Sequence, residues 1–123
     1  MTPSSNAVGE LERRDEITIE TRSRAGQTHR TVIWVVVVDG VPYIASVRGE
    51  RGRWWRELTA SGDGTVIAGR ERVRVRAHRV RSAETKSAVS RAYARKYAGS
   101  GSSLASMRRP AVLDTALRLE LVP

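Results

Sequence analysis

The sequence contains no cysteine, which excludes disulfide bonds, thiolate metal sites and nucleophilic catalysis by cysteine. It also contains no apolar run close to the roughly 20 residues that a membrane-spanning helix needs. The first residues, MTPSSNAVGELERRDE, lack the basic-then-apolar order of a secretory signal. These absences lead us to expect a soluble cytoplasmic protein that does not interact with membranes.

Several signatures of catalysis and metal binding are also absent. The two histidines, His29 and His78, have no His-x-x-His, Glu-x-x-His or acidic cluster around them, so we expect no metal site and interpret both as solvated. No Gly-x-Ser-x-Gly elbow supports serine hydrolysis. No Gly-Lys-Ser/Thr completes a P-loop. The sequence therefore identifies no catalytic residue.

Positive charge is abundant, with 22 Lys and Arg against 13 Asp and Glu and a net charge of +9. Such a charge is one indication of nucleic-acid binding. Only Lys86 and Lys96 are lysines, however, and a GC-rich coding sequence produces such an arginine excess whatever the function. The segment 70–81 carries arginines on one face but no aromatic side chain for base stacking. We interpret it as solvated and keep nucleic-acid binding as a minor alternative.

The length of 123 residues suits a single domain. We expect residues 1–14 to form a disordered or loosely attached arm and residues 15–123 to form one domain. From Glu16 onward, Ile17, Ile19 and Thr21 alternate with polar residues, which is typical of a half-buried strand.

The most apolar segment is TVIWVVVV, residues 31–38. Both of its faces are apolar and rich in β-branched residues, which predicts a central strand covered on both sides. Asp39-Gly40 follows directly and favours a two-residue hairpin turn. A partner strand is therefore expected over residues 41–47.

The later segments predict helices and further strands. Trp54 and Leu58 lie four residues apart, which indicates a short helix at the end of a sheet. A second helix is expected over 84–97, with Ser82 as its N-cap. Alternating patterns predict a hairpin that turns near Gly69 and Arg70, and a last strand within 115–122. The fold class is then mainly β with one or two helices, as a small antiparallel barrel of about six strands.

The stretch VRGERGRWW, residues 47–55, contains the strongest candidate binding site. Gly49 and Gly52 permit positive φ, so successive backbone N–H groups can converge on an anion. Arg48, Arg51 and Arg53 add positive charge and forked donors. A helix that begins near Arg53 would favour the same anion through its N-terminal dipole. The alternative is a solvated basic turn.

The order of these motifs resembles the FMN-binding split β-barrel superfamily, especially its deazaflavin-dependent nitroreductase-like branch. The corresponding segments are SRAGQTHR, TVIWVVVVDG, ASVRG, RWWREL and GTVIAG, within residues 21–70. Over its whole length the chain is also similar to bacterial proteins known only as a domain of unknown function. The resemblance implies a split β-barrel that dimerises, with FMN or deazaflavin in a groove at the subunit interface.

The resemblance also implies roles for individual residues. The cofactor-binding set would be Arg30 and Val32 beside the ring, Ser46, Arg48 and Gly49 at the phosphate, Arg53 nearby, and Trp54 packing the short helix. Two positions depart from the family pattern. A threonine follows Arg30 where proline is common, and Glu57 replaces an asparagine, which brings a carboxylate near a site expected to bind anions.

Three functions remain open. The first is a flavin- or deazaflavin-dependent oxidoreductase that transfers hydride to a small conjugated organic substrate. The second is a cofactor-free split-barrel enzyme, an isomerase or cyclase of a biosynthetic pathway. The third is a non-catalytic barrel that binds a ligand or nucleic acid.

Overall fold

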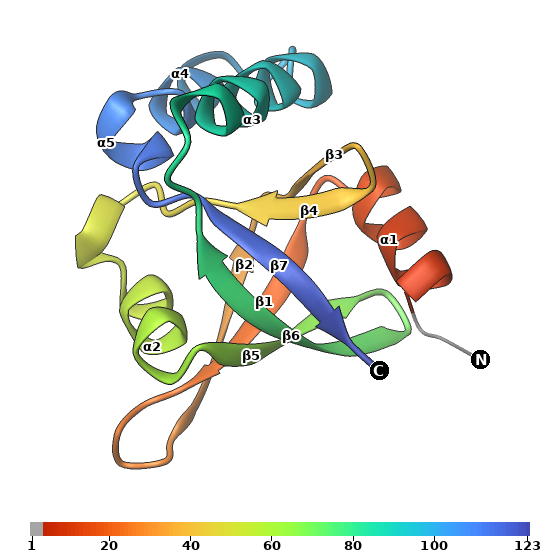
Figure 1. Cartoon of the computed structure of the whole chain (residues 1–123), viewed down its shortest axis with the longest axis vertical. Coiled ribbons are helices and arrows are strands. Elements are labelled where there is room, and N and C mark those ends of the chain that lie inside the picture. Colours follow the sequence, from red (N-terminus) through yellow and green to blue (C-terminus); the bar gives the residue numbers. More distant parts are fainter. Residues whose placement is uncertain (1–3) are drawn as a thin grey trace.

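The computed structural model describes residues 4–123, and it is dominated by a curled antiparallel sheet with helices at its ends and on one side (Figure 1). In chain order the elements are α1 (Ser4–Arg13), β1 (Ile17–Arg22), β2 (Thr28–Ile33), β3 (Val36–Val38), β4 (Val41–Ile44), η1 (Gly49–Arg51), α2 (Arg53–Ser61), β5 (Asp63–Ala68), β6 (Glu71–Arg79), α3 (Ala83–Lys96), α4 (Gly101–Met107), α5 (Pro110–Leu113) and β7 (Leu117–Val122). None of the helices in residues 4–123 has the length and apolar content needed to cross a bilayer.

The strands form one seven-stranded sheet in the order β2-β1-β5-β6-β7-β4-β3, and every neighbouring pair is antiparallel. The two edge strands, β2 and β3, are joined by only Trp34 and Val35. So short a connection spans at most about 11 Å, so the sheet must curl until its edges come close. This confirms the expected fold class, a mainly β protein with a small antiparallel split β-barrel, although the described residues contain more helices than the one or two expected.

The prediction of one central strand over residues 31–38 is wrong in one respect. The segment is divided at Trp34 and Val35, and its halves lie at opposite edges of the sheet. The predicted coverage of both faces holds only in the middle of the segment, because Val32 is 61% exposed. Val35 belongs to the apolar core inside the barrel, whereas Val36 belongs to a second apolar cluster beneath the helices. The unbroken apolar pattern arises because the segment separates two cores.

The second cluster lies between β3–β4 and the helical layer α3, α4 and α5, which Figure 1 shows gathered on one side of the sheet. Tyr93 and Tyr97 of α3 are buried there, and the ring of Trp34 stacks on Tyr97 with centroids 3.9 Å apart. The start of α3 is as predicted, because the Ser82 hydroxyl accepts a hydrogen bond from the Thr85 N–H at 3.2 Å.

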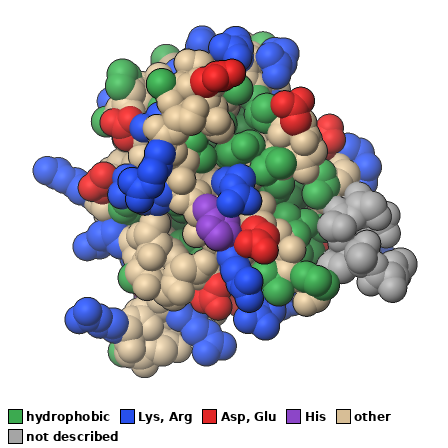
Figure 2. Space-filling model, viewed as in Figure 1, with side chains coloured by type: hydrophobic (Ala, Val, Ile, Leu, Met, Phe, Trp, Pro, Cys, Tyr) green, Lys and Arg blue, Asp and Glu red, His purple; other side chains and the backbone are tan. Residues whose placement is uncertain are grey.

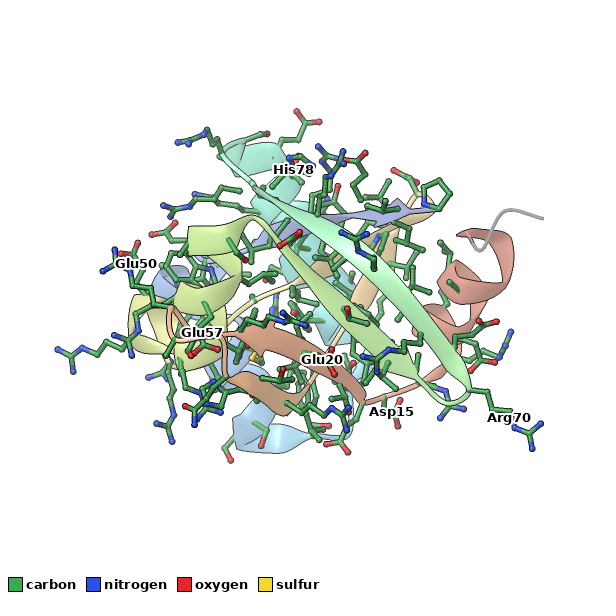
Figure 3. All side chains as sticks on the ribbon, turned by 90° about the horizontal axis from the view of Figure 1, so that it is seen from below. Asp15, Glu20, Glu50, Glu57, Arg70 and His78 are labelled. Atoms are coloured by element: carbon green, nitrogen blue, oxygen red, sulfur yellow. The ribbon has the colours of Figure 1, made fainter. Side chains whose placement is uncertain are left out.

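Both predicted hairpins are present, but the first is shorter than expected, because β3 begins at Val36 and β4 ends at Ile44 rather than at residue 47. Asp39 and Gly40 have φ of 51° and 78°, which is the left-handed geometry of the expected two-residue turn between β3 and β4. The β5–β6 hairpin turns at Gly69 and Arg70, and Figure 3 shows Arg70 at its tip.

The arginines of β6 face solvent while its valines are buried, as expected. In the view of Figure 2 the basic side chains are scattered among acidic and apolar ones and form no continuous groove.

The N-terminal segment differs from the expected loose arm. Residues 4–13 form α1, and Ala7 and Leu11, one turn apart on one face, are each only 2% exposed. Lys96 of α3 also holds this helix, because its Nζ donates to the carbonyl of Leu11 at 2.9 Å and to that of Val35 at 2.8 Å. Residues 1–3 lie outside the described part of the chain.

Candidate functional site

A pocket of about 620 Å³ opens between the edge strand β2, the end of β4, the start of α2 and helix α4. Its walls are contributed by Glu16, Thr31, Val32, Ile33, Trp34, Ala45, Ser46, Val47, Arg48, Gly52, Arg53, Trp54, Ser103, Ser106 and Met107. The pocket lies where the chain passes from one edge of the sheet to the other, so it occupies the split of the barrel. Its volume is within the range of cofactor and small-ligand sites.

The middle of the pocket is apolar. Val32 and Val47, the large apolar side chains most exposed among the described residues, are 61% and 51% exposed and both line it. Trp54 and Met107 contribute buried apolar walls. Exposed valines at a pocket mouth are a surface that a flat apolar ring or a protein partner can cover.

One end of the pocket is suited to an anion. This anion end consists of Ser46, Arg48, Gly52, Arg53 and the N-terminus of α2. The nine-residue helix α2 has Gly52 as its N-cap, so no side-chain oxygen caps its first N–H groups, and its N-terminal dipole favours an anion. Two arginines at the same place add charge and forked donors.

The Ser46 hydroxyl is the most informative atom of the anion end. Ser46 is 1% exposed, and its Oγ has no hydrogen-bond partner among the described residues. A buried hydroxyl without a partner costs free energy that a ligand oxygen can recover. Gly52 is required beside it, because a Cβ at that position would collide with Ser46 Oγ. The space left by the missing side chain therefore keeps this hydroxyl against the helix N-terminus.

The cofactor-binding residues proposed from the sequence separate into two groups. Val32, Ser46, Arg48, Arg53 and Trp54 line the pocket. Arg30 and Gly49 do not line it.

Those two residues have other positions. Arg30 is exposed on β2, and its Nε lies 3.0 Å from Glu20 Oε1. Arg72 lies 2.8 Å from the other Glu20 oxygen, so Arg30 belongs to an ion-pair cluster on the strands. Gly49 is the first residue of η1, and its φ of 66° sets the turn of the loop without contributing to the pocket wall.

Sequence reasoning missed the residues that come from elsewhere in the chain. Ser103, Ser106 and Met107 of α4 lie opposite β2, and no local motif marks them because only the packing of the helical layer brings them there. The expectation of positive φ at Gly52 is wrong, since its φ is −60°, and its proximity to Ser46 is not predicted from the sequence. The available signal for Gly52 was that it directly precedes a helix that has no capping side chain.

Glu57 does not line the pocket, although its charge interacts with that of Arg53, one turn earlier in α2. Glu57 belongs to α2, and Figure 3 labels its side chain. Thr21 Oγ1 of β1 donates to Glu57 Oε1 at 2.8 Å, and His29 Nδ1 of β2 lies 3.0 Å from Oε2. Burial alone raises the pKa of Glu57, but the hydrogen bonds from Thr21 and His29 outweigh it and leave the pKa below its ordinary value.

The interpretation of His29 as solvated is wrong, since its side chain is only 24% exposed and paired with Glu57. His78 is more exposed, as expected, and its Nε2 lies 2.8 Å from Glu120. Within residues 4–123, no group of three or more His, Asp or Glu side chains is arranged to hold a metal ion.

Fold and pocket together define a small split-barrel protein with a pocket of about 620 Å³ that has an anion end. The chain belongs to the bacterial family described as "Uncharacterized protein conserved in bacteria (DUF2255)", whose model matches residues 7–119. Among curated proteins, none matches the chain.

Solved structures share the fold at low sequence identity. An FMN-binding protein from Syntrophomonas wolfei subsp. wolfei has a TM-score of 0.66 and 14% identity, covering 98% of this chain and 80% of that one. The heme storage protein HutZ from Vibrio cholerae has a TM-score of 0.62 and 14% identity, covering 100% and 91%. A conserved hypothetical protein from Mycobacterium tuberculosis has a TM-score of 0.65 and 14% identity, covering 99% and 81%. These likenesses establish the fold and leave the ligand to be argued from the pocket.

Proposed function

We propose that this protein binds a phosphorylated flavin-type cofactor, FMN or a deazaflavin, and is an oxidoreductase that transfers hydride to a small conjugated organic substrate. One observation carries the proposal. The buried hydroxyl of Ser46 has no partner among the described residues and lies beside Arg48, Arg53 and the uncapped N-terminus of α2, at one end of a pocket of about 620 Å³. The likeness in fold to an FMN-binding protein supports the same choice of ligand.

The residues of the pocket divide the work of binding. Arg48 and Arg53 would hold the phosphate by charge-assisted hydrogen bonds, with Ser46 Oγ and the first N–H groups of α2 as neutral donors. Val32 and Trp54 would cover the ring system and exclude water from it. A flavin or deazaflavin supplies the hydride chemistry itself when bound, so the side chains bind and orient rather than react.

The assembly that we propose is a homodimer. The edge strand β2 carries Val32, whose side chain is 61% exposed, and Val47 is exposed at the same mouth. A second copy placed over this mouth would bury both valines and enclose the ring end of the pocket. The family resemblance stated above supports the same arrangement.

The proposal is tested by titrating the purified protein with FMN, a deazaflavin and heme, and then titrating three variants with the ligand that binds. Arg48→Ala should weaken cofactor binding on the order of ten- to a hundredfold, because a charge-assisted contact contributes about 1.5–3 kcal/mol. Arg48→Lys should restore only part of this, because an ammonium lacks the planar fork. Arg76→Ala, on the exposed face of β6, is the matched control and should bind as the wild type does.

Each other outcome points elsewhere. Equal affinities of all four proteins would remove the anion end from the binding site. Binding of heme alone would replace the flavin. Failure of the wild type to bind any of the three would favour a cofactor-free isomerase or cyclase, and steeply salt-dependent binding to nucleic acid would favour a binding barrel without redox chemistry.

A further inference from the structure

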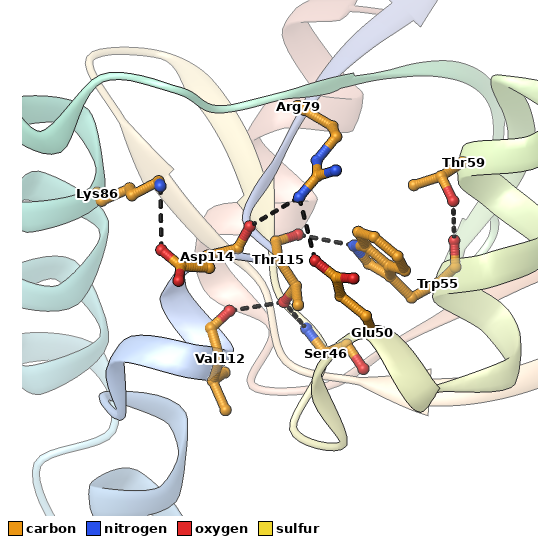
Figure 4. A network of polar contacts seen from close by, with 9 residues as sticks. All are labelled: Ser46, Glu50, Trp55, Thr59, Arg79, Lys86, Val112, Asp114 and Thr115. Atoms are coloured by element: carbon orange, nitrogen blue, oxygen red, sulfur yellow. Dashed lines mark hydrogen bonds and ion pairs between the residues drawn. The ribbon is translucent and has the colours of Figure 1, made fainter.

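The loop that forms the anion end, residues 46–52, is tied to a buried threonine far away in the sequence. Thr115 lies between α5 and β7 and is fully buried. Its Oγ1 accepts a hydrogen bond from the Ser46 N–H at 2.8 Å and donates to the carbonyl of Val112 at 2.6 Å (Figure 4). The Thr115 hydroxyl donates its single proton to the Val112 carbonyl, so Oγ1 can only accept the hydrogen bond from the Ser46 N–H.

From Ser46 the hydrogen bonds continue along the loop into the helix. The Gly49 N–H donates to the Ser46 carbonyl at 2.8 Å, and the Gly52 N–H donates to the Gly49 carbonyl at 3.2 Å. The Arg56 N–H of α2 then donates to the Gly52 carbonyl at 3.0 Å. Each step fixes the next turn of the backbone, so the position of α2 depends on that of Ser46.

Helix α2 is also hydrogen-bonded directly to Thr115. The indole Nε1 of Trp55 donates to the backbone carbonyl of Thr115 at 2.9 Å (Figure 4). The guanidinium of Arg79 lies over the Trp55 ring at 5.2 Å and its Nη2 is 3.5 Å from Glu50, so β6 braces the same loop from outside. The hydrogen bonds therefore form a closed circuit from Thr115 through Ser46, Gly49 and Gly52 to α2 and back.

The circuit uses both backbone groups of Ser46 and leaves its hydroxyl free of partners among the described residues. We propose that Thr115 is the positioning residue of the anion end. It does not line the pocket, but it sets the backbone of Ser46 and thereby holds the hydroxyl ready for a ligand oxygen beside the α2 N-terminus. The identity of that oxygen as the cofactor's phosphate rests on the proposed function.

The test compares Thr115→Val, which keeps the shape and removes the acceptor, with Thr115→Ser, which keeps the hydroxyl. The probes are inorganic phosphate and FMN, followed by tryptophan fluorescence. Thr115→Val should bind each probe about three- to tenfold more weakly, as for the loss of one neutral hydrogen bond. Thr115→Ser should bind within about twofold of the wild type. Trp55→Phe, which removes the other bond to Thr115, should weaken binding in the same direction and covers the case that Thr115→Val does not fold.

A double-mutant cycle with Ser46→Ala separates positioning from a general loss of stability. If Thr115 acts by holding the Ser46 hydroxyl, Thr115→Val should weaken binding less in the Ser46→Ala background than in the wild type, because only the effect that the backbone carries to α2 remains there. Losses that multiply, or a Thr115→Val protein that binds like the wild type, would overturn the inference.

Amide hydrogen exchange tests the circuit without any ligand. In Thr115→Val the N–H groups of Ser46, Gly49 and Gly52 should exchange faster, while those of the β1–β5 pairing keep their wild-type rates. If the wild type binds no probe, the proposed function fails, and unchanged exchange at Ser46 would separately refute the role of Thr115.

Discussion

The hydroxyl of Ser46 and the absence of a side chain at Gly52 determine the chemistry of the anion end. Ser46 Oγ can stay buried without a partner only because Gly52 has no Cβ to occupy its place. Most residues at such a position would displace the serine or open the start of α2. The need for glycine here is a need for space, since Gly52 has φ of −60° and adopts no left-handed geometry.

Gly52→Ala should therefore reduce ligand binding more than it reduces stability. The added Cβ meets Ser46 Oγ, so either the serine rotamer or the loop must shift, and we expect cofactor affinity to fall about tenfold or more. Gly99→Ala is the matched control, because a Cβ there meets nothing within 4 Å. Isothermal titration of both variants is the measurement. Equal affinities of the two variants would show that Ser46 needs no such space.

Five of the seven residues assigned to the site from the sequence line the pocket, and the reason is local. Ser46, Arg48, Arg53 and Trp54 belong to one strand–loop–helix passage, whose order alone brings them together. The local order of residues could not predict where the Arg30 side chain lies. Its position depends on Glu20, which the β1–β2 register places opposite it, and a register of two strands cannot be read from either strand by itself.

At the scale of elements, α2 is held at both ends of its buried face. Its N-terminal turn is bound through Trp55 to Thr115, and its later turn is bound through Glu57 to Thr21 of β1 and His29 of β2. A glutamate at this position is thus explained by its contacts in the structure. The carboxylate joins the helix to the edge strand that forms the opposite wall of the pocket.

The hydrogen bonds of Glu57 with Thr21 and His29 predict that the stability of the fold depends on pH. Because its pKa is lowered in the folded state, ionised Glu57 stabilises the fold above the pKa of the unfolded chain, and this contribution is lost as pH falls through the lower folded value. Glu57→Gln should lower the free energy of unfolding by about 1–2 kcal/mol at pH 7 and by progressively less below about pH 4.

Urea unfolding of the variant and wild type between pH 3 and pH 7 measures this dependence. Glu120→Gln is the control, because it removes the same type of pair, with His78, from an exposed site and should change stability little. A constant difference between Glu57→Gln and the wild type across this pH range would contradict the prediction.

The elements with a regular period were predictable, and those defined by distant contacts were not. Period two identified β1 and β6, and spacing of four identified α2 and α3, because one side of each is buried. The polar segment of α1 buries Ala7 and Leu11, which form too short a pattern to indicate a helix. It is held as a helix by contacts such as the one from Lys96, 85 positions away from Leu11. Such a contact leaves no trace in the local pattern.

At the scale of the whole molecule, the split between β2 and β3 leaves an unpaired strand edge and an apolar pocket mouth in the same place. An exposed edge strand with a 61%-exposed valine favours association with another chain. The proposed homodimer would resolve both features at once, and it would make the enclosure of the ring end a property of the assembly.

Val32→Asp should then produce a monomer. A charge buried in the proposed interface costs several kcal/mol, so we expect the dimer dissociation constant to rise on the order of a hundredfold or more. Light scattering at high micromolar concentration should give twice the chain mass for the wild type and the chain mass for Val32→Asp. Ala60→Asp, an exposed position at the end of α2 outside the pocket, is the control and should remain dimeric. A monomeric wild type at this concentration would refute the proposed assembly, and a dimeric Val32→Asp would place its interface on another surface.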